Sequence, residues 1–203
     1  MFFKLNPKLA LAALFVIAAL PGFSQVVPAA YQGGLPFAVG GGMSDWNVDW
    51  GQGNKFGGAT LWMDYFPPFR PKVLHGIGVE IEAHDVHFNL NPPPNLRQVT
   101  VGGGALYTWR HFQNFSPYAK FEMGWGREDF PNRNPLGSKP YQHDVVIYMA
   151  PGAGLEYRVY RHIWVRADYE YQRWGPIPPA ITSLTPNGFT FGAMFDFRHH
   201  RGL

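Results

Sequence analysis

Acidic and basic side chains occupy every second position in three short stretches of the chain. Together these stretches carry Glu80, Glu82, Lys120, Glu122, Arg166, Asp168 and Glu170. Charges removed from bulk water need oppositely charged partners, so one chemistry open to this set is a buried network of salt bridges. The other is a narrow path for ions, which rings of charged side chains can line. We favour the salt-bridge network, and both interpretations require the side chains to share one face.

Histidines offer two further kinds of chemistry, and we expect neither. His84 and His87 are three residues apart, which in a strand points them to opposite faces, so we predict no metal site and no cofactor. His143 beside Asp144 is the nearest approach to a hydrolase or acyltransferase site. That chemistry needs a nucleophile such as serine beside the histidine, and the residue pattern places none there. We therefore predict that the chain is not an enzyme.

The charged positions belong to an alternating pattern that is longest in residues 163–174, IWVRADYEYQRW. One face is apolar or aromatic, and the other carries Arg166, Asp168 and Glu170. Successive side chains of a strand point to opposite sides of its sheet, so this period of two predicts an amphipathic strand. About ten residues suffice for a tilted strand to cross a membrane. A soluble antiparallel sheet with one face on a core would show the same alternation, so the other strands must decide.

The same template predicts eight strands, at residues 37–46, 57–66, 76–88, 97–109, 118–127, 144–158, 163–174 and 188–198. Joins rich in Asn, Gly and Pro follow the odd-numbered strands, whereas the joins at 67–75, 110–117 and 159–162 are more compact. Long loops on one side and shorter turns on the other are typical of outer-membrane barrels. The predicted fold class is all-β, an eight-stranded antiparallel up-and-down transmembrane β-barrel with extracellular loops.

Three features favour a closed membrane barrel over a soluble sandwich. The outward set is apolar on every strand, the inner set collects eight of the 14 acids, and glycine recurs on the inner face. The interior of an eight-stranded barrel is only just wide enough for side chains. We therefore expect the glycines to make room for Arg166, Lys120 and the glutamates, and we expect the lumen to be plugged.

Proline and the aromatic residues give two further expectations. Pro151 lies inside a central strand, where it loses a ladder hydrogen bond, so we expect a bulge there. Aromatic residues near strand ends predict two belts at the membrane interfaces. The candidates are Tyr65, Trp109, Tyr118, Tyr157 and Phe197 on the turn side and Trp46, Trp125 and Tyr171 on the loop side.

The first residues predict export. Lys4 and Lys8 precede or border an apolar run that is too short for a spanning helix, and small residues follow it. We interpret residues 1–24 as a signal peptide and residues 25–203 as one outer-membrane β-barrel domain. The chain has no cysteine, and export without disulfides fits a bacterial envelope. Its net charge of +3 comes without a basic run, so we expect no nucleic-acid partner.

Three stretches of the second half of the chain carry a family resemblance: GAGLEYR at 152–158, IWVRADYEYQ at 163–172 and the aromatic GFTFGAMFDF at 188–197. From residue 35 to 197 the chain resembles the outer-membrane protein β-barrel domain family, which includes small eight-stranded barrels similar to the OmpA transmembrane domain, OmpX and the opacity proteins. Residues 198–203 extend past the terminal aromatic, where family members often end. The resemblance implies that the barrel-assembly machinery reads a signal formed by Phe189, Phe191, Phe195 and Phe197.

We predict a non-enzymatic integral protein of the bacterial outer membrane with a charge-filled lumen. It would act structurally or as a surface-interaction protein through its extracellular loops. Its partners would be outer-membrane lipid, the assembly machinery and an unidentified surface ligand, and the protein would be a monomer. The alternative is a soluble periplasmic barrel that binds an apolar ligand, as lipocalins do, which requires an apolar interior and a polar exterior. A barrel enzyme that modifies lipid A is a further alternative.

Overall fold

The computed structural model describes residues 35–48, 55–67, 76–88, 96–109, 112, 114–131, 141–175 and 183–198. The predicted signal peptide, residues 1–24, lies outside them. Within the described part of the chain, no helix has the length and apolar character needed to cross a membrane. The strand segments are β1 (Phe37–Asn47), β2 (Lys55–Tyr65), β3 (Ile77–Phe88), β4 (Leu96–Thr108), β5 (Phe115–Pro131), β6 (Tyr141–Arg158), β7 (Ile163–Tyr171), β8 (Arg173–Trp174) and β9 (Asn187–Asp196).

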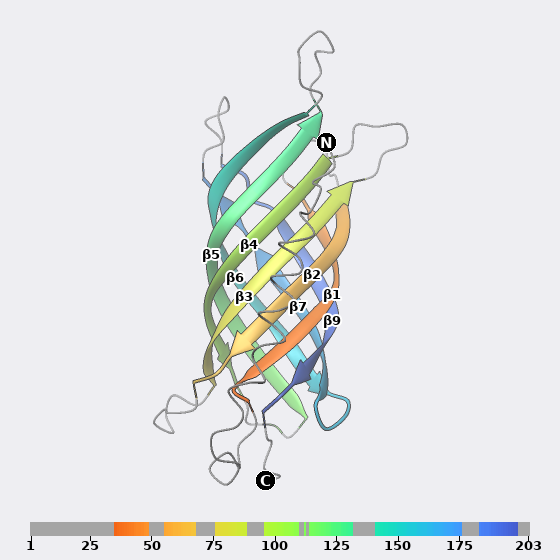
Figure 1. Ribbon diagram of the computed structural model, residues 1–203, viewed down its shortest axis with the longest axis vertical. Coiled ribbons are helices and arrows are strands. Elements are labelled where there is room, and N and C mark those ends of the chain that lie inside the picture. Colours follow the sequence, from red (N-terminus) through yellow and green to blue (C-terminus); the bar gives the residue numbers. More distant parts are fainter. Residues whose placement is uncertain are drawn as a thin grey trace, which may run out of the picture. The chain divides into compact units, whose positions relative to one another are not determined.

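These strands form one closed antiparallel barrel (Figure 1). Pairing runs in sequence order from β1 to β6, continues from β6 to β7 and from β7 to β9, and closes between β9 and β1. β8 continues β7 after Gln172, so the nine segments make eight barrel strands. The predicted fold class is confirmed. A closed ring leaves no unpaired strand edge, which is the condition for a β-structure to cross a bilayer.

The interruption between β7 and β8 lies beside Pro151, in the middle of β6. Pairing of β6 with β7 ends at Gly152↔Glu170, and pairing with β8 resumes at Met149↔Arg173 in the same register. Proline cannot donate a ladder hydrogen bond, and the pairing lapses at this point. The predicted bulge is wrong, because no residue is inserted and the register is unchanged.

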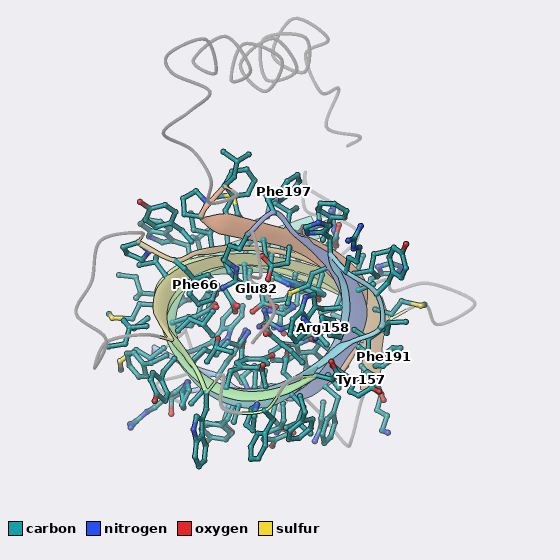
Figure 2. The ribbon with its side chains drawn as sticks, turned by 90° about the horizontal axis from the view of Figure 1, so that it is seen from below. Phe66, Glu82, Tyr157, Arg158, Phe191 and Phe197 are labelled. Atoms are coloured by element: carbon teal, nitrogen blue, oxygen red, sulfur yellow. The ribbon has the colours of Figure 1, made fainter. Side chains whose placement is uncertain are left out.

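Side chains alternate between the outer wall and the interior on every strand (Figure 2). Met43, Leu61 and Phe189 are 78%, 67% and 66% exposed on the outer wall, whereas Glu80 and Glu122 are fully buried. Figure 2 shows Glu82 within the ring of strands. An apolar wall around a polar interior is the pattern of a membrane barrel and the inverse of what the lipocalin-like alternative requires.

Two residues predicted for the aromatic belts lie in the interior instead. Trp46 is 1% exposed and Tyr118 is 4% exposed. Each is an even number of residues from inward neighbours on its strand, Ser44 and Lys120, so strand geometry decides the direction of the side chain. The other belt candidates are exposed, namely Tyr65, Trp109, Trp125, Tyr157, Tyr171 and Phe197.

The predicted alternation of long loops and compact turns holds only in part. The join between β2 and β3, residues 66–76, is longer than the join between β1 and β2, residues 48–54. The shortest join, residues 159–162, lies on the turn side as expected. Loop length therefore gives only partial support for the orientation of the barrel, which stays a prediction.

Inward glycines permit the strong curvature of this narrow barrel. A Cβ atom at Gly104 would lie 1.8 Å from the carbonyl oxygen of Phe121 on β5. A Cβ atom at Gly42 would lie 2.3 Å from the carbonyl oxygen of Phe191 on β9. Side chains cannot be this close to backbone atoms, so these positions require glycine or a shift of the neighbouring strand.

Other inward glycines lie under tryptophan rings of the interior. The nearest atoms to a Cβ at Gly40, Gly126 and Gly188 would belong to Trp62, Trp174 and Trp46, respectively. The expectation that glycines make room for the charged side chains applies to Gly152, which packs against Lys120. At Gly40 and Gly126 it is wrong, since the space there is filled by the indole rings of Trp62 and Trp174.

Gly104→Ala and Gly57→Ala provide a matched test of this curvature. A Cβ at Gly57 meets no atom within 4 Å, unlike the one at Gly104. We expect Gly104→Ala to lower the free energy of unfolding by about 1–3 kcal/mol, because the neighbouring strand must move. We expect Gly57→Ala to change it by no more than about 0.5 kcal/mol. Denaturant unfolding of the protein in lipid vesicles measures both, and equal effects would contradict the assignment.

Candidate functional site

Arg166 of β7 lies in the barrel interior and is 1% exposed. Its Nη1 and Nη2 atoms donate to the two carboxylate oxygens of Glu80 at 2.6 and 2.9 Å. Its Nε donates to Asp168 Oδ2 at 3.0 Å, and Nη1 lies 3.6 Å from Asp64 Oδ1. Bidentate pairing is the strongest arrangement of a guanidinium and a carboxylate. Arg166 therefore links β2, β3 and β7 across the lumen.

Two aromatic rings enclose the guanidinium group. Its central carbon lies 4.5 Å from the ring centroid of Tyr118 and 4.9 Å from that of Trp62. The Tyr118 hydroxyl accepts a hydrogen bond from Arg166 Nε at 2.5 Å and donates one to Asp168 Oδ2 at 2.7 Å. The face of an aromatic ring attracts a desolvated cation. The rings thus hold the charge in place while they occupy space that water would need.

Lys120 of β5 has a fully buried side chain surrounded by carboxylates. Its Nζ lies 3.1 Å from Glu80 Oε1, 2.9 Å from Glu170 Oε2 and 3.7 Å from Glu122 Oε1, and it donates to Glu82 Oε2. Because Glu80 contacts both Lys120 and Arg166, the two cations belong to one ion network. This network contains all seven residues that the sequence analysis selected for it, contributed by β3, β5 and β7.

A short chain of hydroxyl groups adjoins the ion network. The Ser44 hydroxyl contacts those of Thr60 and Thr190, the latter at 2.9 Å. Thr60 Oγ1 is also 2.7 Å from His84 Nδ1. These hydrogen bonds fix the orientation of the His84 ring, whose Nε2 lies 3.6 Å from Glu82 Oε1.

Apolar side chains pack in the lumen on both sides of the ion network. On the loop side, one cluster contains Trp46, Val48, Phe56 and Val86, and another contains Tyr148, Ala150 and Trp174. On the turn side, the clusters are Phe66, Leu106 and Tyr118, and Ala38, Trp62, Trp164 and Met194. The charged centre is therefore separated from both openings of the barrel by tightly packed rings and aliphatic groups.

Two further cations lie on the turn side of the lumen. Arg198 donates to both oxygens of Asp196, at 2.6 and 2.5 Å, and its guanidinium carbon lies 3.9 Å from the ring centroid of Phe66. Arg158 donates to Asn114 Oδ1 at 3.2 and 2.9 Å. These pairs add polar contacts at the turn side of the lumen.

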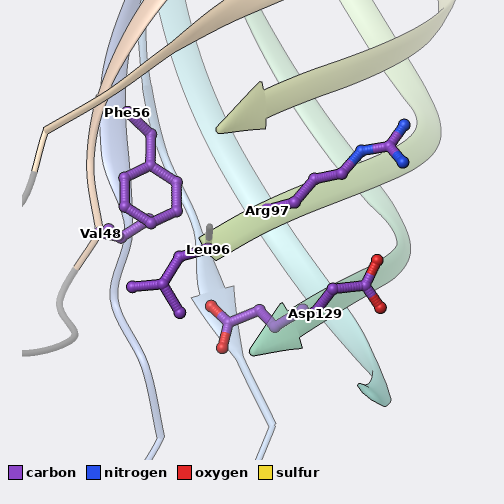
Figure 3. A pocket seen from close by; sticks show the side chains of 6 residues that line it. Val48, Phe56, Leu96, Arg97 and Asp129 are labelled. Atoms are coloured by element: carbon purple, nitrogen blue, oxygen red, sulfur yellow. The ribbon is translucent and has the colours of Figure 1, made fainter. Parts of the chain in front are cut away.

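A small pocket lies at the loop side of the barrel (Figure 3). Its cavity volume is about 10 Å³, and it is lined by Val48, Phe56, Leu96, Arg97, Glu128 and Asp129. Small-molecule sites typically measure about 300–1,000 Å³. The pocket is therefore too small to count as the principal site of the protein.

Sequence reasoning missed several residues of the centre. The sequence analysis does not select Asp64 and His84 for the network, and it assigns Tyr118 to the aromatic belt. Tyr118 lies two residues before Lys120 on the same strand, so strand alternation alone would have placed its side chain inside. His143 and Asp144, considered for catalysis, have side chains outside the described set. The predicted assembly residues Phe189, Phe191, Phe195 and Phe197 are exposed on the outer side.

Arg166→Met tests how strongly the ion network stabilises the fold. Removing the cation leaves buried carboxylates without their partner, so we expect a loss of about 3–5 kcal/mol in the free energy of unfolding. Arg97→Met is the control, because Arg97 pairs with Asp85 at 2.6 Å on the exposed surface. Its loss should cost no more than about 1 kcal/mol. Unfolding in lipid vesicles measures both, and similar costs would contradict a stabilising network.

Solved structures of small membrane barrels are similar to this chain. The neisserial surface protein NspA has 15% sequence identity and a TM-score of 0.63, covering 80% of this chain and 97% of that one. Ail, the attachment invasion locus protein of Yersinia pestis, has 17% identity and a TM-score of 0.54, covering 78% and 96%. OprG of Pseudomonas aeruginosa has 14% identity and a TM-score of 0.50, covering 80% and 96%. At these identities the similarity concerns the fold alone.

No curated protein sequence matched the chain. The outer membrane protein beta-barrel domain family, in contrast, matches residues 15–197, which include every described strand. The closed antiparallel barrel and its apolar outer wall agree with this match. The chain therefore belongs to the outer membrane protein beta-barrel domain family and is an integral β-barrel protein of the bacterial outer membrane.

Proposed function

We propose that the protein is a monomeric, non-enzymatic barrel with a closed lumen, which acts at the cell surface through its loops. The observation that carries the proposal is the interior, where an ion network lies between apolar clusters. A barrel whose lumen is filled in this way would supply a stable membrane anchor. The parts of such a protein that remain available to partners are the joins at its two ends.

Support for a plug over an ion path comes from the contacts of the two central cations. Arg166 is fixed by a bidentate bond to Glu80 and by two aromatic rings, and Lys120 is surrounded by carboxylates. An ion passing the centre would have to displace these partners. It would also have to separate the apolar clusters that pack on both sides. Conduction requires that a permeating ion bind weakly enough to leave its site. The contacts in this lumen instead hold the protein's own cations, Arg166 and Lys120, in the path.

Support for a non-enzymatic role comes from the one hydroxyl–imidazole–carboxylate series in the described interior. Thr60 Oγ1 lies 2.7 Å from His84 Nδ1, and His84 Nε2 lies 3.6 Å from Glu82 Oε1. A nucleophile must reach its substrate, but Thr60 and His84 are 1% and 2% exposed. The Thr60 hydroxyl is also engaged by Ser44. We therefore propose a structural role for this series.

The proposed surface role is supported by the printed names of two similar proteins. NspA is a surface protein, and Ail is an attachment invasion locus protein whose structure is also known with a heparin analogue, sucrose octasulfate. In this chain, the join 132–140 carries Arg133 and Lys139 between the long strands β5 and β6. We propose that the side of the barrel carrying this join faces the cell exterior.

We also propose that the outward aromatic residues of β9 are read during insertion by the barrel-assembly machinery. Phe189, Phe191 and Phe195 alternate along the outer face of β9, and Phe197 follows its end. β9 pairs with β1 and thus closes the barrel. The last strand is therefore a place where recognition and closure coincide.

The closed lumen is tested by single-channel recording on the purified protein in planar bilayers. We expect no stable open conductance, because the ion network and the apolar clusters leave no continuous aqueous path. A general porin recorded in the same bilayer shows that open channels would be detected. Repeated, long-lived conductance steps from the wild-type protein would reject the closed-lumen proposal.

The surface role is tested with cells that carry either the wild-type protein or a variant in which a short Gly-Ser segment replaces residues 132–140. We expect the wild-type cells to bind heparin-coated or matrix-coated surfaces and the variant cells to bind less. The variant should retain its heat-modifiable gel mobility, which reports a folded barrel. Equal binding by wild-type, variant and barrel-free cells would contradict the surface role of this join.

A further inference from the structure

Charged residues are distributed unevenly between the two ends of the barrel. The loop-side joins carry one acid and two bases, which are Asp49, Arg133 and Lys139. The turn-side joins and the residues after β9 carry no acid and six bases, which are Arg70, Lys72, Arg110, Arg161, Arg198 and Arg201. Closure of the barrel brings the strand ends that flank these segments to one rim. The sequence and the topology together therefore make the turn-side rim basic.

The positions of the acids strengthen this asymmetry. The acids on the described outer wall lie near the loop ends of their strands, and each pairs with a base: Asp45 with Lys55, Asp85 with Arg97 and Asp129 with Arg127. At the turn end, the described acids Glu156 and Asp196 are 1% and 0% exposed and face the lumen. A partner that approaches the turn-side rim from outside therefore meets positive charge.

The turn between β6 and β7 shows how the rim presents a base. The N–H groups of Tyr160 and Ile163 each donate to the carbonyl oxygen of the other residue, at 3.1 Å. The Asp196 N–H donates to the carbonyl oxygen of His162 at 2.8 Å, which ties the turn to the end of β9. Both lie at the same end of the barrel (Figure 1). These backbone bonds fix the position of Arg161 at the tip of the turn.

The Arg161 side chain is exposed, and within the described part of the chain no acid pairs with it. The neighbouring His162 differs, because its ring stacks on Phe195 with 5.4 Å between centroids and its Nδ1 lies 2.8 Å from the carbonyl oxygen of Asp196. A guanidinium group presents five N–H donors in a planar fork that matches the oxygens of a phosphate. Arg161 therefore offers its donors to an anion outside the protein.

Exposed aromatic side chains accompany the bases of this rim. Tyr157 and Tyr160 are 52% and 66% exposed at the end of β6 and in the turn that follows it. Trp109 and Phe112 are 53% and 48% exposed on the join between β4 and β5, with 6.1 Å between their ring centroids. Tryptophan and tyrosine are enriched where a membrane meets water, at the level of the lipid headgroups. The aromatic residues therefore place the basic rim at the depth of lipid phosphates.

We propose that the turn-side rim binds the headgroups of anionic phospholipids and that Arg161 contacts their phosphates directly. Anionic lipid attracts basic residues that lie close to a membrane surface. The aromatic residues beside the bases favour a lipid over a soluble polyanion, because they hold the rim against the bilayer. This inference does not depend on the proposed surface role, since it concerns the opposite end of the barrel.

Two tryptophans can report on the two ends of the barrel separately. Trp109 at the turn end and Trp125 toward the loop end are 53% and 66% exposed, and the other described tryptophans are no more than 2% exposed. Trp125→Phe therefore keeps the turn-side reporter, and Trp109→Phe keeps the loop-side reporter. Each protein is placed in vesicles of phosphatidylcholine and phosphatidylglycerol in equal amounts. One lipid at a time carries brominated acyl chains, which quench tryptophan fluorescence on contact.

We expect phosphatidylglycerol to be preferred over phosphatidylcholine by about 5-fold or more at Trp109, since each base near the surface contributes about that factor. We expect no such preference at Trp125. Salt at 1 M should abolish the preference at Trp109, because the Debye length then falls to about 3 Å. Equal quenching of Trp109 by the two lipids, or the same preference at both reporters, would overturn the proposal.

Variants of Arg161 separate its charge from any structural role. In the Trp125→Phe protein, Arg161→Gln should lower the lipid preference by about 5-fold, and Arg161→Lys should retain it because the charge remains. Arg97→Gln is the matched control, since Arg97 pairs with Asp85 at the loop end, and it should leave the preference at Trp109 unchanged. Heat-modifiable gel mobility selects folded material for each variant. An unchanged preference in Arg161→Gln, or an equal loss in Arg161→Gln and Arg161→Lys, would contradict a direct phosphate contact.

Discussion

A bilayer offers no hydrogen bonds to backbone N–H and C=O groups, so a membrane-spanning sheet must close on itself. Closure of only eight strands creates an interior scarcely wider than the side chains that enter it. Every second residue is directed into this space, whatever its type. Charges placed there lose bulk water and must find partners on other strands. The pairing of Arg166 with Glu80, and of Lys120 with four glutamates, follows from this confinement.

The narrow radius also determines how the rest of the interior is filled. Strong curvature brings neighbouring backbones close on the concave side, and Gly42 and Gly104 lie where a Cβ would meet a carbonyl oxygen. Where glycine leaves space, an indole ring covers it, as Trp62 does at Gly40. Glycine and tryptophan are thus complementary within one barrel. The resulting apolar clusters lie on both sides of the ion network, and the low local dielectric of a packed interior increases the electrostatic interactions within the network.

A shared fold does not by itself assign a shared activity, because function depends on sites placed upon the fold. The structurally similar proteins include a neisserial surface protein and an attachment invasion locus protein. In this chain, the interior chemistry is directed inward, to the ion network. The proposed surface chemistry belongs to the joins between strands. The two can therefore change independently, since the wall of paired strands separates them.

The sequence by itself determined the strands, because a period of two is a local property that each segment displays alone. It also determined which residues of β3, β5 and β7 face inward, since parity along a strand fixes the face. The prediction was wrong for Trp46 and Tyr118, because their aromatic character was given more weight than their alternation along the strand. It was also wrong at Pro151, where the strand pairing lapses without a bulge. Only the tertiary structure decided which inward groups meet. Glu80 and Arg166 are far apart in the chain, and their contact depends on register and closure, which no single strand encodes. The convergence of Glu82, His84 and Glu170 has the same origin, because two strands must curve toward one another before their side chains share a point.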